Sequence, residues 1–239
     1  MIVFKNVSVK YEHSGGYAIR DLSLRIEDGE FVFIVGKTGA GKSTLFRILT
    51  RELIPTNGSV KVFNNNLEYI ERRDIPYYRR KLGIIFQDFK LLEDRNVFEN
   101  VAFAQEVIGE NQFKIKKRVL KILNLVGIRN KSDKMPQELS GGEKQKVAIA
   151  RAIINKPSIV LADEPTGNLD EVSTNEIIDI LNIINQNGTT VIVITHDMHL
   201  VERMKKRVLR IDKGELVYDG FGLDHAMREY MENERRGKI

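Results

Sequence analysis

A glycine-rich segment sets the tightest limit on how this chain can fold. It follows the apolar run Phe31 to Val35 and opens a helical pattern over Lys42 to Glu52. This strand–loop–helix context is the one that the phosphate-loop pattern requires. Backbone N–H groups of such a loop converge on phosphate oxygens at the positive end of the helix. We therefore expect a nucleoside triphosphate to bind at Gly36, Lys37, Thr38, Gly39, Ala40, Gly41, Lys42, Ser43 and Thr44.

The pattern that follows this segment predicts an α/β fold. Apolar runs at Leu82 to Phe86, Ile159 to Ala162 and Val191 to Ile194 are nearly continuous. Such runs are typical of strands that are covered on both faces in a parallel sheet. Helical patterns at Thr174 to Gln186 and Asp197 to Lys205 alternate with them, which indicates βαβ units.

The ends of the chain and its middle read differently. Residues from about 88 to 157 look entirely helical, and Gly127 is the expected stop of one helix, so we predict a helical lobe inserted into the sheet domain. Period-two alternation predicts a strand at Ile2 to Val9. We also expect a hairpin of Leu22 to Ile26 with Phe31 to Val35, and a closing hairpin over Val208 to Tyr218.

Length and composition favour one ordered domain. The chain has 239 residues without a linker-like tract, so we expect a domain over 1–222 and a tail over 223–239, in which Met227, Tyr230 and Met231 would pack a short helix. The net charge is +5, but the basic residues are scattered as on solvated helix faces, and we expect no nucleic acid. Apolar runs fall far short of the ~20 residues of a membrane span, and there is no cysteine, so we expect the chain to stay in the cytosol.

Several polar residues stand where chemistry is expected. Lys42 should reach the β- and γ-phosphates, and the Ser43 hydroxyl should bind Mg²⁺. Asp163 ends the strand Ile159 to Ala162, at the sheet edge where ligands of α/β folds bind, and should hold Mg²⁺ through water. Glu164 is aimed differently and should orient and polarise the water that attacks the γ-phosphate.

Two more strand ends carry polar side chains. His196 follows the run Val191 to Thr195 and is expected to donate a hydrogen bond to the γ-phosphate or to Glu164. Gln87 follows Leu82 to Phe86 and is expected to touch both the metal-bound water and the hinge of the helical lobe. An ordinary surface role is the alternative reading for each.

The segment Leu139-Ser140-Gly141-Gly142-Glu143 precedes a helical pattern at Lys144 to Ile154. The start of that helix would present Ser140 and the N–H groups of Gly141 and Gly142 to an anion. The chain's own phosphate loop lies about a hundred residues away and on another lobe. The simplest use of the segment is therefore to complete the ATP site of a second copy.

With these motifs in this order, the chain resembles the nucleotide-binding subunit of ABC transporters over roughly residues 1–220. The resemblance implies a P-loop NTPase (RecA-like) parallel sheet core with an N-terminal antiparallel β subdomain and an inserted α-helical lobe. It also implies a head-to-tail homodimer that forms on ATP binding. Such a dimer holds two ATP molecules, each between the phosphate loop of one copy and the LSGGE segment of the other. Asn168 to Asp170 would then connect the two sites, and Tyr11, rather than Tyr17, would stack on adenine.

The segments Phe86 to Leu92, Asn96 to Ala104 and Asp163 to Asp170 are similar to the cell-division branch of that family. This implies an ATPase on the cytoplasmic face of the cell membrane, peripheral to an integral FtsX-like partner and linked indirectly to cell-wall hydrolases. Two alternatives stay open: the ATPase subunit of a lipoprotein-release or macrolide-efflux exporter, and a soluble ATPase that acts on ribosomes or DNA. Lys144 and Lys146 depart from the usual Gln and Arg, and Lys146 lacks the fork geometry of arginine.

Overall fold

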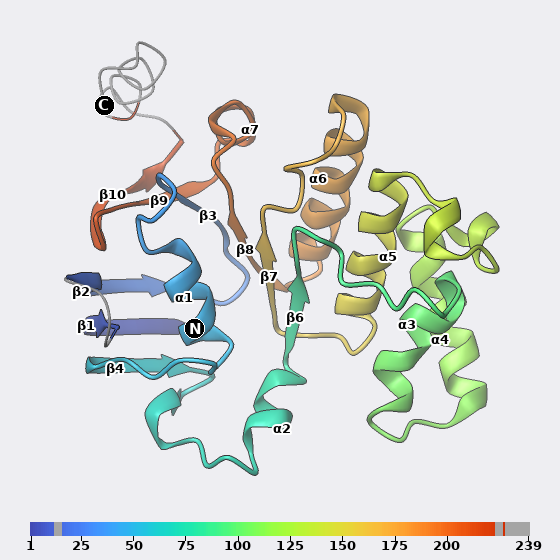
Figure 1. Cartoon of the computed structure of the whole chain (residues 1–239), viewed down its shortest axis with the longest axis horizontal. Helices are drawn as coiled ribbons and strands as arrows, with labels where there is room; N and C mark the ends of the chain where they lie inside the picture. Colours follow the sequence, from blue (N-terminus) through green and yellow to red (C-terminus); the bar gives the residue numbers. More distant parts are fainter. Residues whose placement is uncertain (12–15, 223–226, 228–239) are drawn as a thin grey trace. The chain divides into compact units, whose positions relative to one another are not determined.

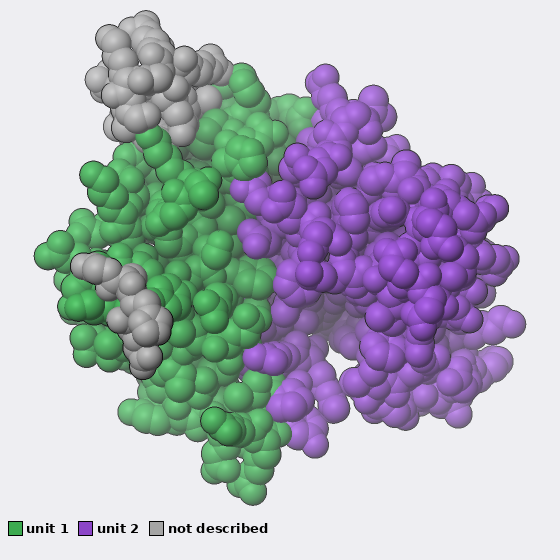
Figure 2. Space-filling model, viewed as in Figure 1, with its two compact units in different colours: residues 1–75, 192–239 green, residues 76–191 purple. Residues whose placement is uncertain are grey.

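The computed structural model describes residues 1–11, 16–222 and 227. Two compact units make up the chain: residues 1–75 with 192–239, and residues 76–191 (Figure 2). The predicted helical lobe lies inside the second unit. Of the predicted tail, Met227 is described and fully buried, whereas Tyr230 and Met231 lie outside the described residues. Within the described ranges, no helix is both long enough and apolar enough to span a bilayer.

The first unit contains an antiparallel sheet in the order β2-β1-β4-β5 (Figure 1). Its strands are β1 (Ile2–Lys10), β2 (Tyr17–Ile26), β4 (Asn57–Val62) and β5 (Asn65–Asn66). Ile2 and Phe4 are buried, and so are Val7 and Val9, because a register shift at Asn6 (φ 47°) turns the second pair to the same face. The predicted antiparallel subdomain at the N-terminus is confirmed.

The second sheet of this unit has the order β10-β9-β3-β8. Its strands are β3 (Phe31–Val35), β8 (Thr190–Ile194), β9 (Arg207–Asp212) and β10 (Glu215–Phe221), with β8 running into the other unit. β3 pairs in parallel with β9, and β9 pairs antiparallel with β10, which confirms the predicted closing hairpin. Helices α1 (Lys42–Leu49) and α7 (Met198–Met204) and the 3₁₀ turn η1 (Leu67–Tyr69) complete the unit.

The predicted hairpin of Leu22 to Ile26 with Phe31 to Val35 is wrong, because β2 and β3 belong to different sheets. Every residue of β3 is buried, which requires a layer covered on both faces. β2 alternates between buried and exposed residues and pairs with β1. The segment Glu27 to Glu30 therefore connects two sheets.

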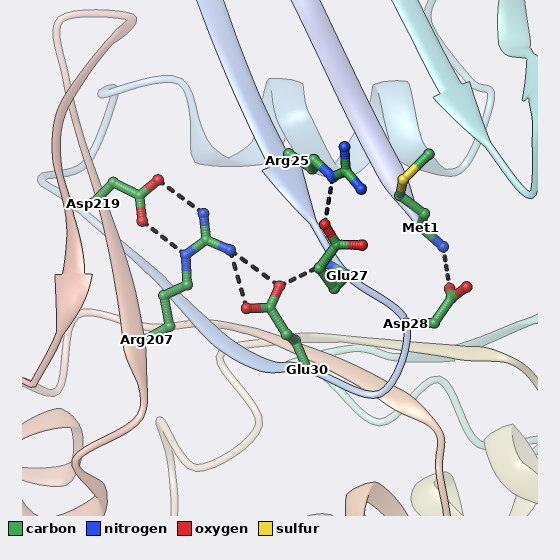
Figure 3. A network of polar contacts seen from close by, with 7 residues as sticks. All are labelled: Met1, Arg25, Glu27, Asp28, Glu30, Arg207 and Asp219. Atoms are coloured by element: carbon green, nitrogen blue, oxygen red, sulfur yellow. Dashed lines mark hydrogen bonds and ion pairs between the residues drawn. The ribbon is translucent and has the colours of Figure 1, made fainter.

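One arginine ties three strands together at one end (Figure 3). Arg207, the first residue of β9, donates from Nε and Nη2 to Asp219 of β10 at 2.7 and 2.8 Å. Its Nη1 lies 3.1 and 3.0 Å from the two carboxylate oxygens of Glu30, the residue before β3. The hydrogen bonds that Arg207 donates to Asp219, and then those that it donates to Glu30, raise the pKa of the guanidinium above its ordinary value. This network holds the start of β9 and the residue before β3 to the end of β10.

The second unit joins a parallel strand pair to a group of helices (Figure 1). The strands are β6 (Leu82–Ile85) and β7 (Ile159–Asp163). The helices and 3₁₀ turns are α2 (Ile75–Arg79), α3 (Val97–Glu106), α4 (Gln112–Leu125), η2 (Arg129–Lys131), η3 (Pro136–Glu138), α5 (Gly141–Ile153) and α6 (Glu171–Gln186).

Helices α3, α4 and α5 pack on one another within the predicted lobe 88–157. Ile115, Val119 and Leu123 form the buried stripe of α4, and Gly127 with φ 73° follows its end, as the sequence predicts. The helix predicted from Lys144 instead begins at Gly141, because Ser140 caps it.

Candidate functional site

The predicted site residues fall into two groups. Tyr11, the phosphate loop and His196 belong to the first unit. Gln87, Ser140, Gly141, Gly142, Asp163, Glu164 and Asp170 belong to the second unit. Each group has its own geometry.

The phosphate loop runs from the end of β3 into α1, and close backbone contacts hold it. Gly36 has φ 151°, and a Cβ placed on it would lie 2.2 Å from the Ile211 carbonyl oxygen of β9. Gly41 has φ 113°, and its Cβ would lie 2.5 Å from the carbonyl oxygen of Ala18. Both contacts are too close for any side chain, so glycine is required at these positions.

The chemical groups of the loop lie at the start of α1. Lys42 Nζ donates hydrogen bonds to the carbonyl oxygens of Gly36 and Lys37, the latter at 2.9 Å, so the ammonium lies over the loop. Ser43 is exposed at the first turn, whereas Thr44 is buried. The N–H groups of this turn lie at the positive end of the helix, which makes the helix start a suitable place for phosphate oxygens.

The turn between β9 and β10 supports the loop, and sequence reasoning did not single it out. Gly214 donates its N–H to the Ala40 carbonyl at 2.9 Å and accepts from the Arg20 N–H of β2 at 2.9 Å. Its φ is 85°, and a Cβ there would lie 2.9 Å from the Ala18 oxygen. The turn sequence Asp212 to Glu215 predicted a hairpin, but nothing local in it indicated a contact with the phosphate loop.

Tyr11, the predicted adenine stacker, follows β1 and is tied to the same loop. Its hydroxyl lies 3.2 Å from Thr44 Oγ1 and accepts from Arg47 Nη1 at 3.4 Å. The Arg47 guanidinium lies 5.8 Å from the centre of the tyrosine ring. Tyr11 is half-buried, whereas Tyr17 is 49% exposed. Among the residues predicted for this site, Tyr11 and Thr44 are thus directly in contact.

His196 lies just beyond β8 and is exposed. The next residue, Asp197, caps α7 by accepting the Leu200 N–H at 3.0 Å. Its own N–H donates to Thr195 Oγ1 at 3.0 Å. The backbone on either side of the histidine is therefore held by short local hydrogen bonds.

In the second unit, Asp163 ends β7 and Glu164 follows it with φ 45°. A left-handed conformation is unusual for glutamate and costs of the order of 1–3 kcal/mol. A Cβ on Gly167 would lie 3.6 Å from Gln87 Nε2 and 3.7 Å from the Glu164 Cβ, so both side chains lie against Gly167. Gln87 and Glu164 are therefore neighbours in the second unit.

Ser140 caps the start of α5. Its Oγ accepts the Glu143 N–H at 3.3 Å, and its N–H donates to Glu143 Oε2 at 2.9 Å, which is a capping box. Glu143 also pairs with Lys131. That ion pair, followed by the Ser140 N–H, lowers the pKa of the glutamate carboxyl below its ordinary value.

The start of α5 packs tightly against the start of α6. A Cβ on Gly142 would lie 2.6 Å from Ser173 Oγ, and one on Gly141 would lie 3.3 Å from Leu169. Asp170 caps α6, accepting from the Ser173 N–H at 2.9 Å and its hydroxyl at 2.7 Å, and these bonds lower the pKa of the aspartate. The predicted segment Asn168 to Asp170 therefore adjoins Gly141 and Gly142.

Two basic residues of α5 have contacts that the sequence did not reveal. Arg151 donates from Nη1 and Nη2 to the carbonyl oxygens of Lys90 and Phe89 at 2.6 and 2.8 Å. Phe89 and Lys90 both have positive φ, 59° and 47°, just after β6 and Gln87. Lys146, noted as a departure from arginine, pairs with Glu176 of α6 at 2.8 Å.

Known proteins resemble this chain along most of its length. A family model described as ABC transporter matches residues 19–167. The cell division ATP-binding protein FtsE of Bacillus subtilis (strain 168) is 49% identical over 219 residues, which are 92% of this chain and 96% of that protein. FtsE of Mycobacterium tuberculosis is 45% identical over 92% of this chain and 95% of its own.

Among solved structures, the fold is similar to the dimeric post-hydrolysis state of the ATP-binding cassette MJ0796 bound to ADP and Pi. The TM-score is 0.84 at 33% identity, over 94% of this chain and 100% of that chain. The predicted α/β cassette fold is thereby confirmed.

Proposed function

Because this chain belongs to the ABC transporter family and is an ATP-hydrolysing subunit of that type, we propose that it drives conformational change in an FtsX-like membrane partner during cell division. The observation that carries the proposal is the similarity to FtsE proteins along 92% of the chain, with 96% of the Bacillus subtilis protein covered. The tight phosphate loop and the strained Glu164 supply the ATPase chemistry on which it depends.

In this proposal the phosphate loop binds ATP through its N–H groups and Lys42, and Tyr11 stacks on the adenine. Ser43, Gln87 and Asp163 offer hydroxyl, amide and carboxylate oxygens, which are the hard ligands that Mg²⁺ takes, so these residues suit that ion. Mg²⁺ would neutralise charge on the phosphates. This donor set agrees with a metal that is held partly by substrate phosphates, as Mg²⁺ usually is.

Glu164 is the proposed general base, which orients and polarises the attacking water. Its neighbour Gln87 supports this role, since the two side chains lie against Gly167. His196 is the proposed hydrogen-bond donor to the γ-phosphate, supported by its place at the end of β8. The strained backbone of Glu164 is of the kind that functional sites retain.

Two copies of the chain are proposed to close around two ATP, with Ser140, Gly141 and Gly142 of each copy completing the site of the other. MJ0796, which is similar in fold, forms a dimer bound to ADP and Pi. The capping box leaves a helix start at Gly141 whose N–H groups suit a phosphate. Asp170 and its neighbours, packed beside this helix start, would connect the two sites.

The membrane partner is proposed to dock near Gln87 and the segment Asp88 to Leu92. A groove with a volume of about 480 Å³ lies there, between α2, β6, α3 and α5 of the second unit. It opens near the lower edge of that unit in Figure 2. The chain would thus sit at the cytoplasmic face of the cell membrane, with a link through its partner to cell-wall hydrolases.

The test of the ATPase assignment is the substitution Glu164→Gln in purified protein. Loss of a general base should lower the ATP hydrolysis rate by roughly 10²–10⁴-fold. The matched control is Glu171→Gln, which changes the same functional group at an exposed position of α6 and should leave the rate unchanged. Hydrolysis by Glu164→Gln at the wild-type rate would contradict the role of Glu164.

The test of the membrane partner is co-purification of the tagged chain from detergent-solubilised membranes. Recovery of a four-span protein with a large extracytoplasmic domain would support the cell-division role. Recovery of an exporter subunit instead would contradict that role and point to the lipoprotein-release or macrolide-efflux class.

A further inference from the structure

The groove of the second unit has an apolar wall. Five apolar side chains face this space. They are Ile84 of β6, Phe86 just after β6, Leu92, Phe103 of α3 and Ile108 just after α3. A volume of about 480 Å³ lies within the ~300–1,000 Å³ of ligand pockets, so the groove holds a few side chains and not a whole helix. Helices that dock in such grooves insert the side chains at i, i+3, i+4 and i+7.

The charge of the groove has one sign. Arg79, Arg80, Lys90 and Arg151 all line it, and no Asp or Glu is among the described residues that do so. Lys90 is paired with Asp88 at 2.6 Å, and both are exposed to solvent. The Arg80 guanidinium lies 4.8 Å from the centre of the Tyr77 ring, a contact that orients the charge without neutralising it.

Arg151 is the most enclosed of these cations. Its guanidinium donates hydrogen bonds to the neutral carbonyls of Phe89 and Lys90, and burial lowers the pKa of this guanidinium below the ordinary value. A guanidinium has five N–H donors, of which these bonds use two. A half-buried cation held by carbonyl groups gains strongly from an incoming carboxylate, because charge-assisted hydrogen bonds are about twice as strong as neutral ones.

We propose that this groove selects an amphipathic helix of a protein partner that carries a carboxylate among its apolar side chains, and that Arg80 and Arg151 bind that carboxylate. This inference rests on the proposed function, because it takes the groove to be the docking site of the membrane partner. Apolar side chains of the helix fill the wall formed by Phe86 and Phe103, and the acidic side chain determines which helices are accepted. A basic helix is rejected, since it would bring like charges together in a confined space.

The test uses synthetic helical peptides of roughly 16 residues, a length at which a helix in water becomes stable enough to measure. All carry the same leucine stripe, and they differ at one flanking position that is Glu, Gln or Lys. Binding to the full-length protein is measured by fluorescence anisotropy. We expect the Glu peptide to bind at least about tenfold more tightly than the Gln peptide, and the Lys peptide most weakly.

The protein variants are Arg80→Glu in the groove and, as the matched control, Lys117→Glu on the exposed side of α4. Both change the net charge equally. Arg80→Glu should abolish the preference for Glu and restore binding of the Lys peptide, while Lys117→Glu should leave the order of the peptides unchanged. Equal binding of the Glu and Gln peptides, no binding of any peptide, or equal effects of both variants would each overturn the proposal.

ATP hydrolysis by the same samples separates this inference from the proposed function. Normal hydrolysis without a preference for the Glu peptide overturns only the inference. A clear preference for Glu in a protein that hydrolyses no ATP supports the groove chemistry and contradicts the ATPase cycle.

Discussion

At the scale of single residues, one residue type serves different needs within the phosphate loop. Gly36 and Gly41 are required because carbonyl oxygens approach within 2.2 and 2.5 Å of where a side chain would begin. Gly39 has φ 81° and no atom within 4 Å of a Cβ, so only its backbone conformation favours glycine. The spacing of the motif predicts all three, but it does not distinguish these reasons.

This difference predicts unequal effects of alanine. Gly39→Ala should cost roughly 1–2 kcal/mol, the strain of a left-handed alanine. Gly36→Ala should cost clearly more and weaken ATP binding, because β3 and β9 must move apart to admit the methyl group. Urea unfolding and the binding of a fluorescent ATP analogue measure the two effects, and equal losses for both variants would show that the contact with Ile211 is not limiting.

How far a residue could be predicted depended on how local its reason is. Lys42, Asp163 and Glu164 follow from strand ends and helix starts that are visible in the sequence. Gly214 did not, because its partners Ala40 and Arg20 are far away in the chain. The left-handed backbone of Glu164 could not be predicted either, because glutamate has no preference for this conformation.

At the scale of elements, α5 connects two places of functional interest in the second unit. The Ser140 capping box begins the helix, and Arg151 near its end holds the residues that follow β6. Thirteen residues span about 20 Å. The sequence already held the signal for the true helix start, since Ser140 and Glu143 have the S-x-x-E spacing of a capping box. The strand β5 lacked such a signal, because it has only two residues, both asparagine.

The capping box predicts a pH dependence. The folded state holds the pKa of Glu143 below its ordinary value of 4.5, so the glutamate stabilises the fold fully above about that pH and less as the pH falls through the lowered pKa. Glu143→Gln keeps an amide oxygen that can accept the Ser140 N–H but loses the charge that pairs with Lys131 at the start of α5, and this should cost roughly 0.3–1 kcal/mol at pH 7. The difference from the wild type should shrink below pH ~4.5.

Urea unfolding at a series of pH values checks this dependence. The exposed Glu93→Gln serves as control and should track the wild type throughout. A deficit of Glu143→Gln that stays constant down to low pH would show that the charge of the glutamate is not what stabilises α5.

At the scale of the whole molecule, the proposed function requires two copies, and that is where a single sequence is least informative. The LSGGE segment indicates a partner only because it is separate from the chain's own phosphate loop. The groove chemistry was not visible at all, since its cations come from α2, the segment after β6 and α5, and they gather only on folding.

Sharing of sites between copies predicts complementation. Lys42→Ala should inactivate the phosphate loop, and Ser140→Arg should block the segment that faces the partner's ATP. Each variant alone should be almost inactive, but a mixture should regain part of the ATPase activity, because heterodimers contain one intact composite site. The measurement is steady-state ATP hydrolysis at a fixed total concentration, and no gain on mixing would argue against sites shared between copies.

The support that the β9–β10 turn gives to the phosphate loop has a consequence for biosynthesis. Gly36 packs on Ile211, and Ala40 accepts a hydrogen bond from Gly214, so these contacts form only after the ribosome has made residues 211–214, long after the loop itself. At ~5–20 residues per second, this delay is about 10–35 s. A nascent chain therefore carries the nucleotide-binding motif for this time without the contacts that support the folded loop.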